Sequence, residues 1–260
     1  MPTAKKLAFA PFFLISCFFL ISQLSPVFKS ADLIFSMSLP TLIQFIVIAL
    51  LINLSGILYI IFAGLALDWK IVLPIGLAAA VLPFIFFDTA IGLVLGVGIF
   101  VILLLSFLSL DHTMKTYSTF QPASLFGPAI RHFAWMFILI IAVGYFLGIS
   151  KVVSQNGFQI PDTLIDAALK FAPLPQVEGA DLTNNLIKQT VKDQIQSFIK
   201  PYISFIPAIL ALLLFLTFQS LTSVINLLIY PLLWLIFLIL EKTGFIKFTQ
   251  EMRPVKKIVI

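Results

Sequence analysis

Residues 201–240, PYISFIPAILALLLFLTFQSLTSVINLLIYPLLWLIFLIL, decide the class of fold, because these forty residues include no charged side chain. As one helix the stretch would be about 60 Å long, at roughly 1.5 Å per residue. The hydrocarbon core of a bilayer is only about 30 Å thick, and backbone at that depth must be helical. The stretch therefore predicts either a hairpin of two short spans or one crossing with a re-entrant or interfacial part.

The turn of such a hairpin would fall in the polar patch QSLTS, residues 219–223, with Asn226 close behind. Neither Gly nor Pro lies between residues 208 and 230, so the turn has no strong local signal. Length nevertheless favours the hairpin, which would bring the chain to seven hydrophobic helical segments.

The whole chain has the composition of a membrane protein. Of its 260 residues, 61% are hydrophobic and 10% are charged, whereas about 25% of the residues in an average soluble domain are charged. The net charge of +5 does not indicate nucleic acid binding, because the basic residues lie mostly at the ends of hydrophobic runs. We expect an all-α, polytopic helical integral membrane protein with about six to seven transmembrane helices plus amphipathic extramembrane helices.

The distribution of charge divides the chain into four parts. We expect a five-span transmembrane bundle in 1–150, an extramembrane amphipathic helical segment in 151–200, a C-terminal transmembrane helix or hairpin in 201–241 and a basic tail in 242–260. The apolar runs place the first five spans at about 7–28, 40–66, 71–87, 90–110 and 133–149, with a polar loop over 111–132.

The positive-inside rule predicts the orientation of these spans. Lys5 and Lys6 place the N-terminus in the cytoplasm, and the loop with Lys115 and Arg131 returns there four spans later. A single crossing in 201–240 leaves the basic tail inside, with six crossings, whereas a hairpin places it outside, with seven. Charge therefore favours six crossings, against the argument from length. Because no organelle address is visible, we expect a bacterial plasma membrane.

Five polar residues of the apolar regions are candidates for a functional path. They are Gln44, Asn53, Asp88, Gln219 and Asn226. Such residues more often form hydrogen bonds between helices, and Asp88 lies where a turn between two spans of ordinary length is expected. In a small transporter or channel subunit the five would instead line a polar path. Their clustering in one interior would favour transport, and their scattering toward the interfaces would argue against it.

Two GxxxG motifs, Gly92/Gly96 and Gly144/Gly148, predict close approach between helices. We expect them to serve internal packing first, with contacts in a homo-oligomer as the alternative.

The chain contains no HExxH, GxSxG, Walker A or GxGxxG motif. Asp111 and His112 are adjacent, so their side chains do not face each other on a helix. We therefore expect no catalytic, cofactor-binding or metal-binding residue. Three hypotheses follow, in order of preference. The first is a non-catalytic membrane scaffold or assembly partner that docks another protein through 151–200. The second is a small transporter or channel subunit. The third is an interfacial lipid-acting enzyme that uses Asp111 and His112.

Overall fold

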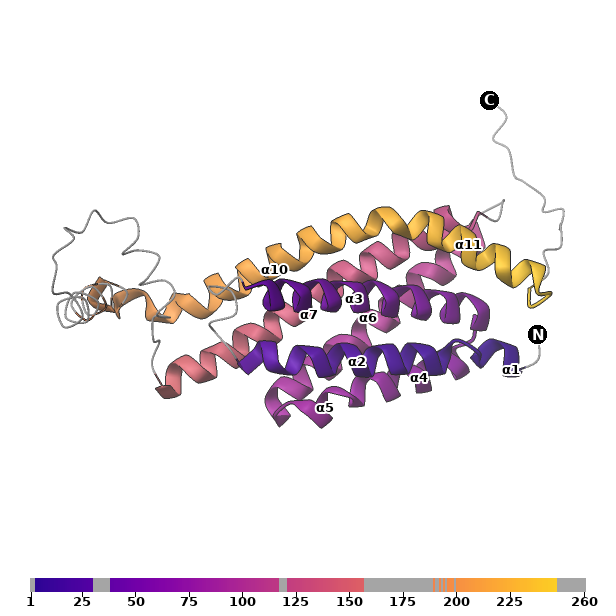
Figure 1. Ribbon diagram of the computed structural model, residues 1–260. Helices are drawn as coiled ribbons and strands as arrows, with labels where there is room; N and C mark the ends of the chain where they lie inside the picture. Colours follow the sequence, from indigo (N-terminus) through magenta and orange to yellow (C-terminus); the bar gives the residue numbers. More distant parts are fainter. Residues whose placement is uncertain are drawn as a thin grey trace, which may run out of the picture.

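A computed structural model describes residues 3–29, 38–116, 121–156 and 200–246, together with isolated positions between 189 and 198. These described residues form helices and no strand (Figure 1), which confirms the all-α prediction. The elements are α1 (Thr3–Leu7), α2 (Ala10–Lys29), α3 (Leu39–Ala66), α4 (Trp69–Val81), α5 (Pro83–Phe86), α6 (Thr89–Thr116), α7 (Pro122–Asn156), the 3-10 turn η2 (Lys200–Phe205), α10 (Ile206–Ile225), the 3-10 turn η3 (Asn226–Leu228) and α11 (Ile229–Lys242).

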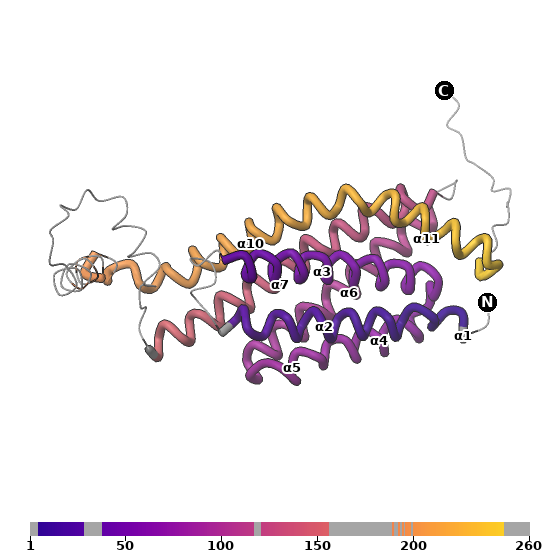
Figure 2. The backbone as a smooth tube through the Cα atoms, in the orientation of Figure 1, coloured from indigo at the N-terminus to yellow at the C-terminus, as the bar shows by residue number. Residues whose placement is uncertain are grey.

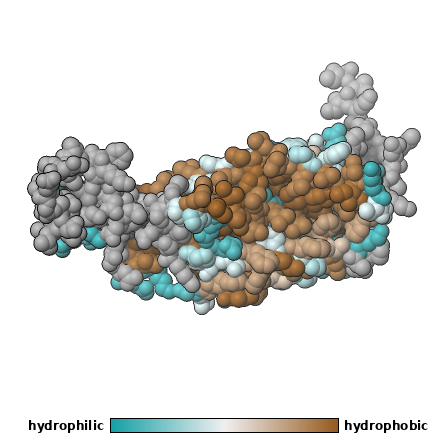
Figure 3. Space-filling view, in the orientation of Figure 1, coloured by the Kyte–Doolittle hydropathy of each residue, from teal (hydrophilic) through white to brown (hydrophobic). Residues whose placement is uncertain are grey.

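Six helical stretches in the described part of the chain are long and apolar enough to cross a membrane. They are Lys5–Phe28, Leu39–Ala66, Trp69–Phe86, Thr89–Thr116, Pro122–Gln155 and Lys200–Lys242. Figure 3 shows hydrophobic side chains over the length of α10 and α11, with hydrophilic ones toward the ends of the bundle. The chain therefore has the build of a multi-pass membrane protein.

The uncharged stretch 201–240 is one helical rod, and the hairpin prediction is wrong (Figure 2). Helix α10 runs through the polar patch at 219–223 without turning, and only η3 separates it from α11. The hydroxyls of Thr217, Ser220 and Ser223 each donate to the carbonyl four residues earlier, at 2.7–2.9 Å. Ser220 and Ser223 of the patch thus satisfy their hydroxyls within the helix and do not require a turn.

The rod brings the first and last described residues to the same end of the bundle (Figure 1). Lys5 Nζ donates to Phe245 O at 3.4 Å, and the rings of Phe9 and Phe245 lie 6.4 Å apart. We call this end the Lys5 end. At the opposite end, which we call the Asp88 end, Lys151 at the end of α7 pairs with Asp88 at the start of α6. Six alternating passes explain this arrangement, and seven do not.

Two helices extend further than their apolar runs predict. Helix α6 continues to Thr116 and α7 begins at Pro122, so most of the expected loop 111–132 is helical. Helix α7 also ends at Asn156 and not near residue 149. The apolar run marks only the part of a helix that suits lipid, while local contacts such as the Lys115–Asp111 ion pair, at 2.6 Å, support further turns.

Helix α7 packs against α2, α3, α6, α10 and α11, and is the centre of the bundle. Tyr59 of α3 lies fully buried beside it, with ring centroids of Tyr59 and Phe133 6.0 Å apart. The Tyr59 hydroxyl donates to Leu103 O of α6 at 2.5 Å. One side chain thus joins α3, α6 and α7, and gives the buried hydroxyl the partner that it requires.

Both GxxxG motifs are covered by other helices of the same chain. A Cβ added to Gly96 would lie 2.5 Å from Ala80 O of α4, and one added to Gly144 would lie 2.8 Å from the Phe28 ring. Gly92 and Gly148 are buried in the same two contacts. The structure therefore uses these glycines for internal packing, and their faces are not open to a second copy.

Candidate functional site

The structure separates the five polar candidates into two groups. Asn53 on α3, Gln219 on α10 and Asn226 at the start of η3 each carry a buried side-chain oxygen that has no hydrogen-bond partner among the described residues. Gln44 and Asp88 lie elsewhere and are engaged with other groups.

Gln44 joins two helices, because its Nε2 donates to Gln23 O of α2 at 3.4 Å. Asp88 lies between α5 and α6 at the exposed Asp88 end, with 58% of its side chain accessible, and it forms an ion pair with Lys151. Its backbone oxygen accepts from Gly92 N at 2.7 Å, in the first turn of α6. Asp88 is thus part of a surface turn and does not lie with Asn53, Gln219 and Asn226.

Thr222 belongs with the first group, although the sequence analysis did not select it. Its hydroxyl oxygen is buried and has no partner among the described residues. Gln219, Thr222 and Asn226 follow one another at spacings of three and four residues, so they lie along one side of the helix. This spacing is visible in the sequence and is the signal that would have identified Thr222. We call Asn53, Gln219, Thr222 and Asn226 the polar seam.

The polar seam interrupts a buried apolar stripe. Helix α10 packs against both α7 and α3. Its stripe consists of Leu210, Leu214 and Phe218 before Thr222, and it continues on α11 with Ile229 and Leu233. Thr222 at the centre of this stripe is buried. Gln219 and Asn226 are partly exposed, but their side-chain oxygens are buried. They need a reason other than solubility.

The register of α3 and α10 brings Asn53 to the level of the other seam residues. The two helices run in the same direction (Figure 2), and the rings of Phe45 and Phe218 lie 5.3 Å apart. Eight residues further along each helix are Asn53 and Asn226. Asn53 Nδ2 donates to Ala49 O at 2.9 Å, which fixes the orientation of the amide and leaves Oδ1 as the atom without a partner.

The backbone of the rod changes at the seam. The 3-10 turn η3 begins at Asn226, and Pro231, which has no N–H, follows in the first turn of α11. A short 3-10 stretch inside a long helix often marks a hinge. Thr222 is 22 residues after Lys200 and 20 before Lys242, so the seam lies near the middle of the apolar rod. Interrupted helices near the middle of the bilayer are typical of binding sites in secondary transporters.

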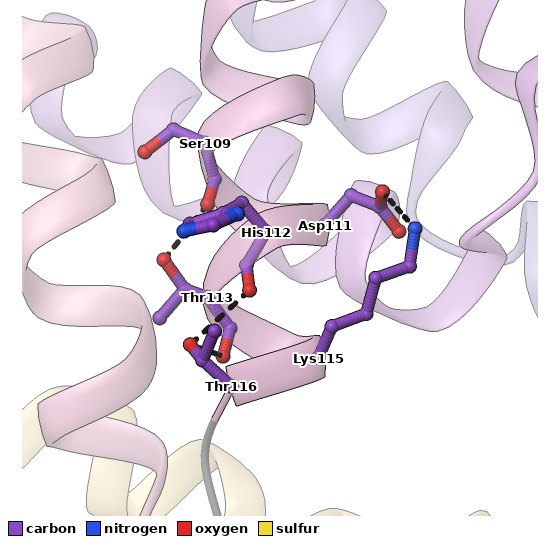
Figure 4. A network of polar contacts seen from close by, with 6 residues as sticks. All are labelled: Ser109, Asp111, His112, Thr113, Lys115 and Thr116. Carbon is purple, nitrogen blue, oxygen red and sulfur yellow. Dashed lines mark hydrogen bonds and ion pairs between the residues drawn. The ribbon is translucent and has the colours of Figure 1, made fainter.

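Asp111 and His112 form no acid–base pair. Figure 4 shows the two side chains on different sides of α6, with Asp111 beside Lys115. The hydroxyls of Thr113 and Thr116 bond to backbone carbonyls of the same helix. Within the described ranges, no three His, Cys, Asp or Glu side chains lie close enough to hold a metal ion. The contacts of this network are local helix contacts.

The docking segment expected in 151–200 lies outside the described residues, apart from the end of α7 and a few positions after 188. Docking of a partner there stays a prediction. No protein-family model matches the chain, no curated protein matches its sequence and no solved structure matches its fold.

Proposed function

We propose that this protein is a small membrane transporter or channel subunit that passes a small polar solute or cation along the polar seam. The observation that carries the proposal is the row of buried oxygens without partners, on Gln219, Thr222 and Asn226, beside the interruption of the rod. Leaving such an atom unsatisfied costs about 1–3 kcal/mol. A solute, a cation or water that reaches the seam would offset this cost.

The chemistry of the seam limits what it would carry. All its unpartnered atoms are oxygens of neutral amide or hydroxyl groups. Helices α3, α7 and α10 contain no Asp or Glu. Divalent cations prefer carboxylate ligands. The seam therefore suits a monovalent cation or a neutral solute that donates hydrogen bonds.

Transport by the purified protein tests the proposal. Vesicles that contain the protein would be compared with empty vesicles for flux of Na⁺, K⁺ and glycerol. We expect the protein to raise the flux of at least one probe, and Asn226→Leu and Thr222→Val to remove the increase. A structural water would satisfy the same oxygens, so the readout must be movement across the membrane and not occupancy.

Ser220→Ala provides the matched control. Ser220 lies on the exposed side of α10, two residues from Thr222, and its hydroxyl donates to Leu216 O at 2.9 Å. This variant should keep the wild-type flux. If the wild-type protein passes none of the three probes, or if both seam variants pass them as the wild type does, the proposal fails.

We also propose that the Lys5 end faces the cytoplasm of a bacterial cell. The helix ends at the Lys5 end carry more basic residues than those at the Asp88 end. The first group is Lys5, Lys6, Lys70, Lys115, Arg131 and Lys242, and the second is Lys29, Lys151 and Lys200. Basic residues near the ends of spans favour the cytoplasmic side. A reporter fused after Ile260 that is active only in the cytoplasm should be active, and an external C-terminus would contradict this orientation.

A further inference from the structure

A second feature, independent of the polar seam, lies at the Lys5 end where α7 faces α11. Arg131 of α7 is exposed, and its Nη2 donates to the Tyr230 hydroxyl at 3.2 Å. Its guanidinium carbon lies 5.7 Å from the centre of the Tyr230 ring. Among the described residues Arg131 forms no ion pair. A guanidinium has five N–H donors, so Tyr230 positions the group and leaves most of its donors available.

Tyr230 itself is held close to α7. A Cβ added to Gly127 would lie 3.4 Å from the Tyr230 ring, so the ring packs against the backbone of α7 where no side chain intervenes. This contact restricts the position of the Arg131 guanidinium, and a group whose position is already restricted loses less entropy when it binds a ligand.

Aromatic side chains around Arg131 are typical of the interface between headgroups and acyl chains. The His132 ring stacks on that of Trp135, with centroids 6.4 Å apart. Trp135 is 41% exposed, and Trp234, one turn after Tyr230, is 62% exposed. Exposed Trp and Tyr concentrate at the edges of a bilayer. Arg131 contacts Tyr230, one turn past Asn226 on the Lys5 side of the seam, and a long Arg side chain can extend from such a position toward the headgroups.

Exposed apolar side chains continue from this point toward the middle of the bundle. They are Leu139 and Val143 on α7 and Val224, Leu227 and Leu228 on the rod. A cation that extends toward the headgroups beside an apolar face matches a phospholipid in both the headgroup and the acyl chains. Arg binds phosphate through two N–H groups, with a geometry that Lys does not reproduce.

We propose that Arg131, held by Tyr230, binds the phosphate of one anionic phospholipid, whose acyl chains lie along the apolar faces of α7 and the rod. Because η3 and α11 lie directly next to this lipid, the headgroup contact holds the rod to α7 on the Lys5 side of the seam.

Native mass spectrometry of the full-length protein released from detergent tests the proposal. With phosphatidylglycerol present, the wild type should retain one lipid, and phosphatidylcholine should bind more weakly. Arg131→Gln should weaken the retention of phosphatidylglycerol by roughly tenfold or more, because charge-assisted hydrogen bonds are lost. Arg131→Lys should retain the lipid less well than the wild type and better than Arg131→Gln, because it keeps the positive charge and loses the two parallel N–H donors of the guanidinium.

Lys115→Gln is the control for charge alone. Lys115 lies at the same end and is 72% exposed at its side chain, but it is paired with Asp111. This variant should retain the lipid as the wild type does. Equal retention by Arg131→Gln and the wild type overturns the proposal, and so does an equal loss in Lys115→Gln. If inorganic phosphate displaces the lipid at equal concentration, the site binds free phosphate and the proposal of a lipid ligand is wrong.

Discussion

Buried hydroxyl groups at two places in the bundle differ in whether they have a hydrogen-bond partner. Between α2 and α3, the hydroxyls of Ser16 and Ser55 lie 2.8 Å apart, and each gives the other a partner. Along α10, Thr222 is equally buried and has none among the described residues. A polar group in a membrane interior needs a partner from the protein or from whatever enters. The serine pair is therefore a structural contact, and the polar seam is where we propose that a ligand binds.

The helices that carry these contacts also differ in how tightly they are held. In its apolar window, α3 has 67% of its residues buried, whereas the rod has 22%. Elements with few buried contacts open at lower free energy than the core does. The difference indicates a central framework of α2, α3, α6 and α7, with α10 and α11 at its edge, where more of their surface is open to lipid.

The largest effect should come from disturbing the framework. In Gly96→Ala the new Cβ would lie 2.5 Å from Ala80 O, which belongs to backbone and cannot give way easily. We expect the free energy of unfolding to fall by about 1–3 kcal/mol, measured by unfolding in mixed micelles.

Gly76→Ala on α4 is the control, because its nearest neighbours would be 3.8 Å from the new Cβ. It should leave the stability unchanged or raise it, since Ala favours helix over Gly. An equal loss in both variants would mean that α4 and α6 do not pack closely at Gly96.

A smaller loss should follow from breaking the serine pair. Ser16→Ala removes one partner of the buried Ser55 hydroxyl, which keeps its hydrogen bond with the Cys17 thiol. Hydrogen bonds between membrane helices contribute about 0.6 kcal/mol on average, and we expect a loss of this size. A double-mutant cycle with Ser55→Ala measures the coupling between the two residues. No coupling would show that the pair does not stabilise the contact of α2 with α3.

The smallest effect, and one of opposite sign, should come from the seam. Thr222→Val replaces an unpartnered hydroxyl with a methyl group of similar size. Without ligand, its stability should equal or exceed that of the wild type, because the cost of the unsatisfied oxygen disappears. A loss as large as that of Ser16→Ala in the same unfolding assay would mean that Thr222 is a structural contact after all.

Sequence reasoning succeeded where local chemistry decides the structure. Helix α3 begins beside its predicted start, because Ser38 caps it and Pro40 suits its first turn. The next helix, α4, begins after Asp68, which accepts from Lys70 N at 3.0 Å. Hydropathy also located α2, α3, the α4–α5 span and the start of α6 within three residues.

Sequence reasoning failed where the structure depends on which face of a helix packs against the bundle. Ser220, Thr222 and Ser223 have similar polarity, yet only Thr222 is turned into the bundle, while the other two bond to their own helix. Which face packs depends on α3 and α7, which are far away in sequence. The same dependence explains why the sequence alone left a hairpin in 201–240 open beside the single crossing that the backbone makes.

Access of water to the seam is the most direct test of the central claim that the seam receives a ligand. Thr222→Cys and Leu214→Cys would each be made in a Cys17→Ala background, which removes the native cysteine. Thr222 and Leu214 lie on the same buried stripe, two turns apart. A small, cationic, water-soluble thiol reagent should modify the cysteine of Thr222→Cys roughly tenfold faster than that of Leu214→Cys, because water reaches a polar site and not a dry apolar one. Equal, negligible rates at both positions would show a dry seam and contradict the account.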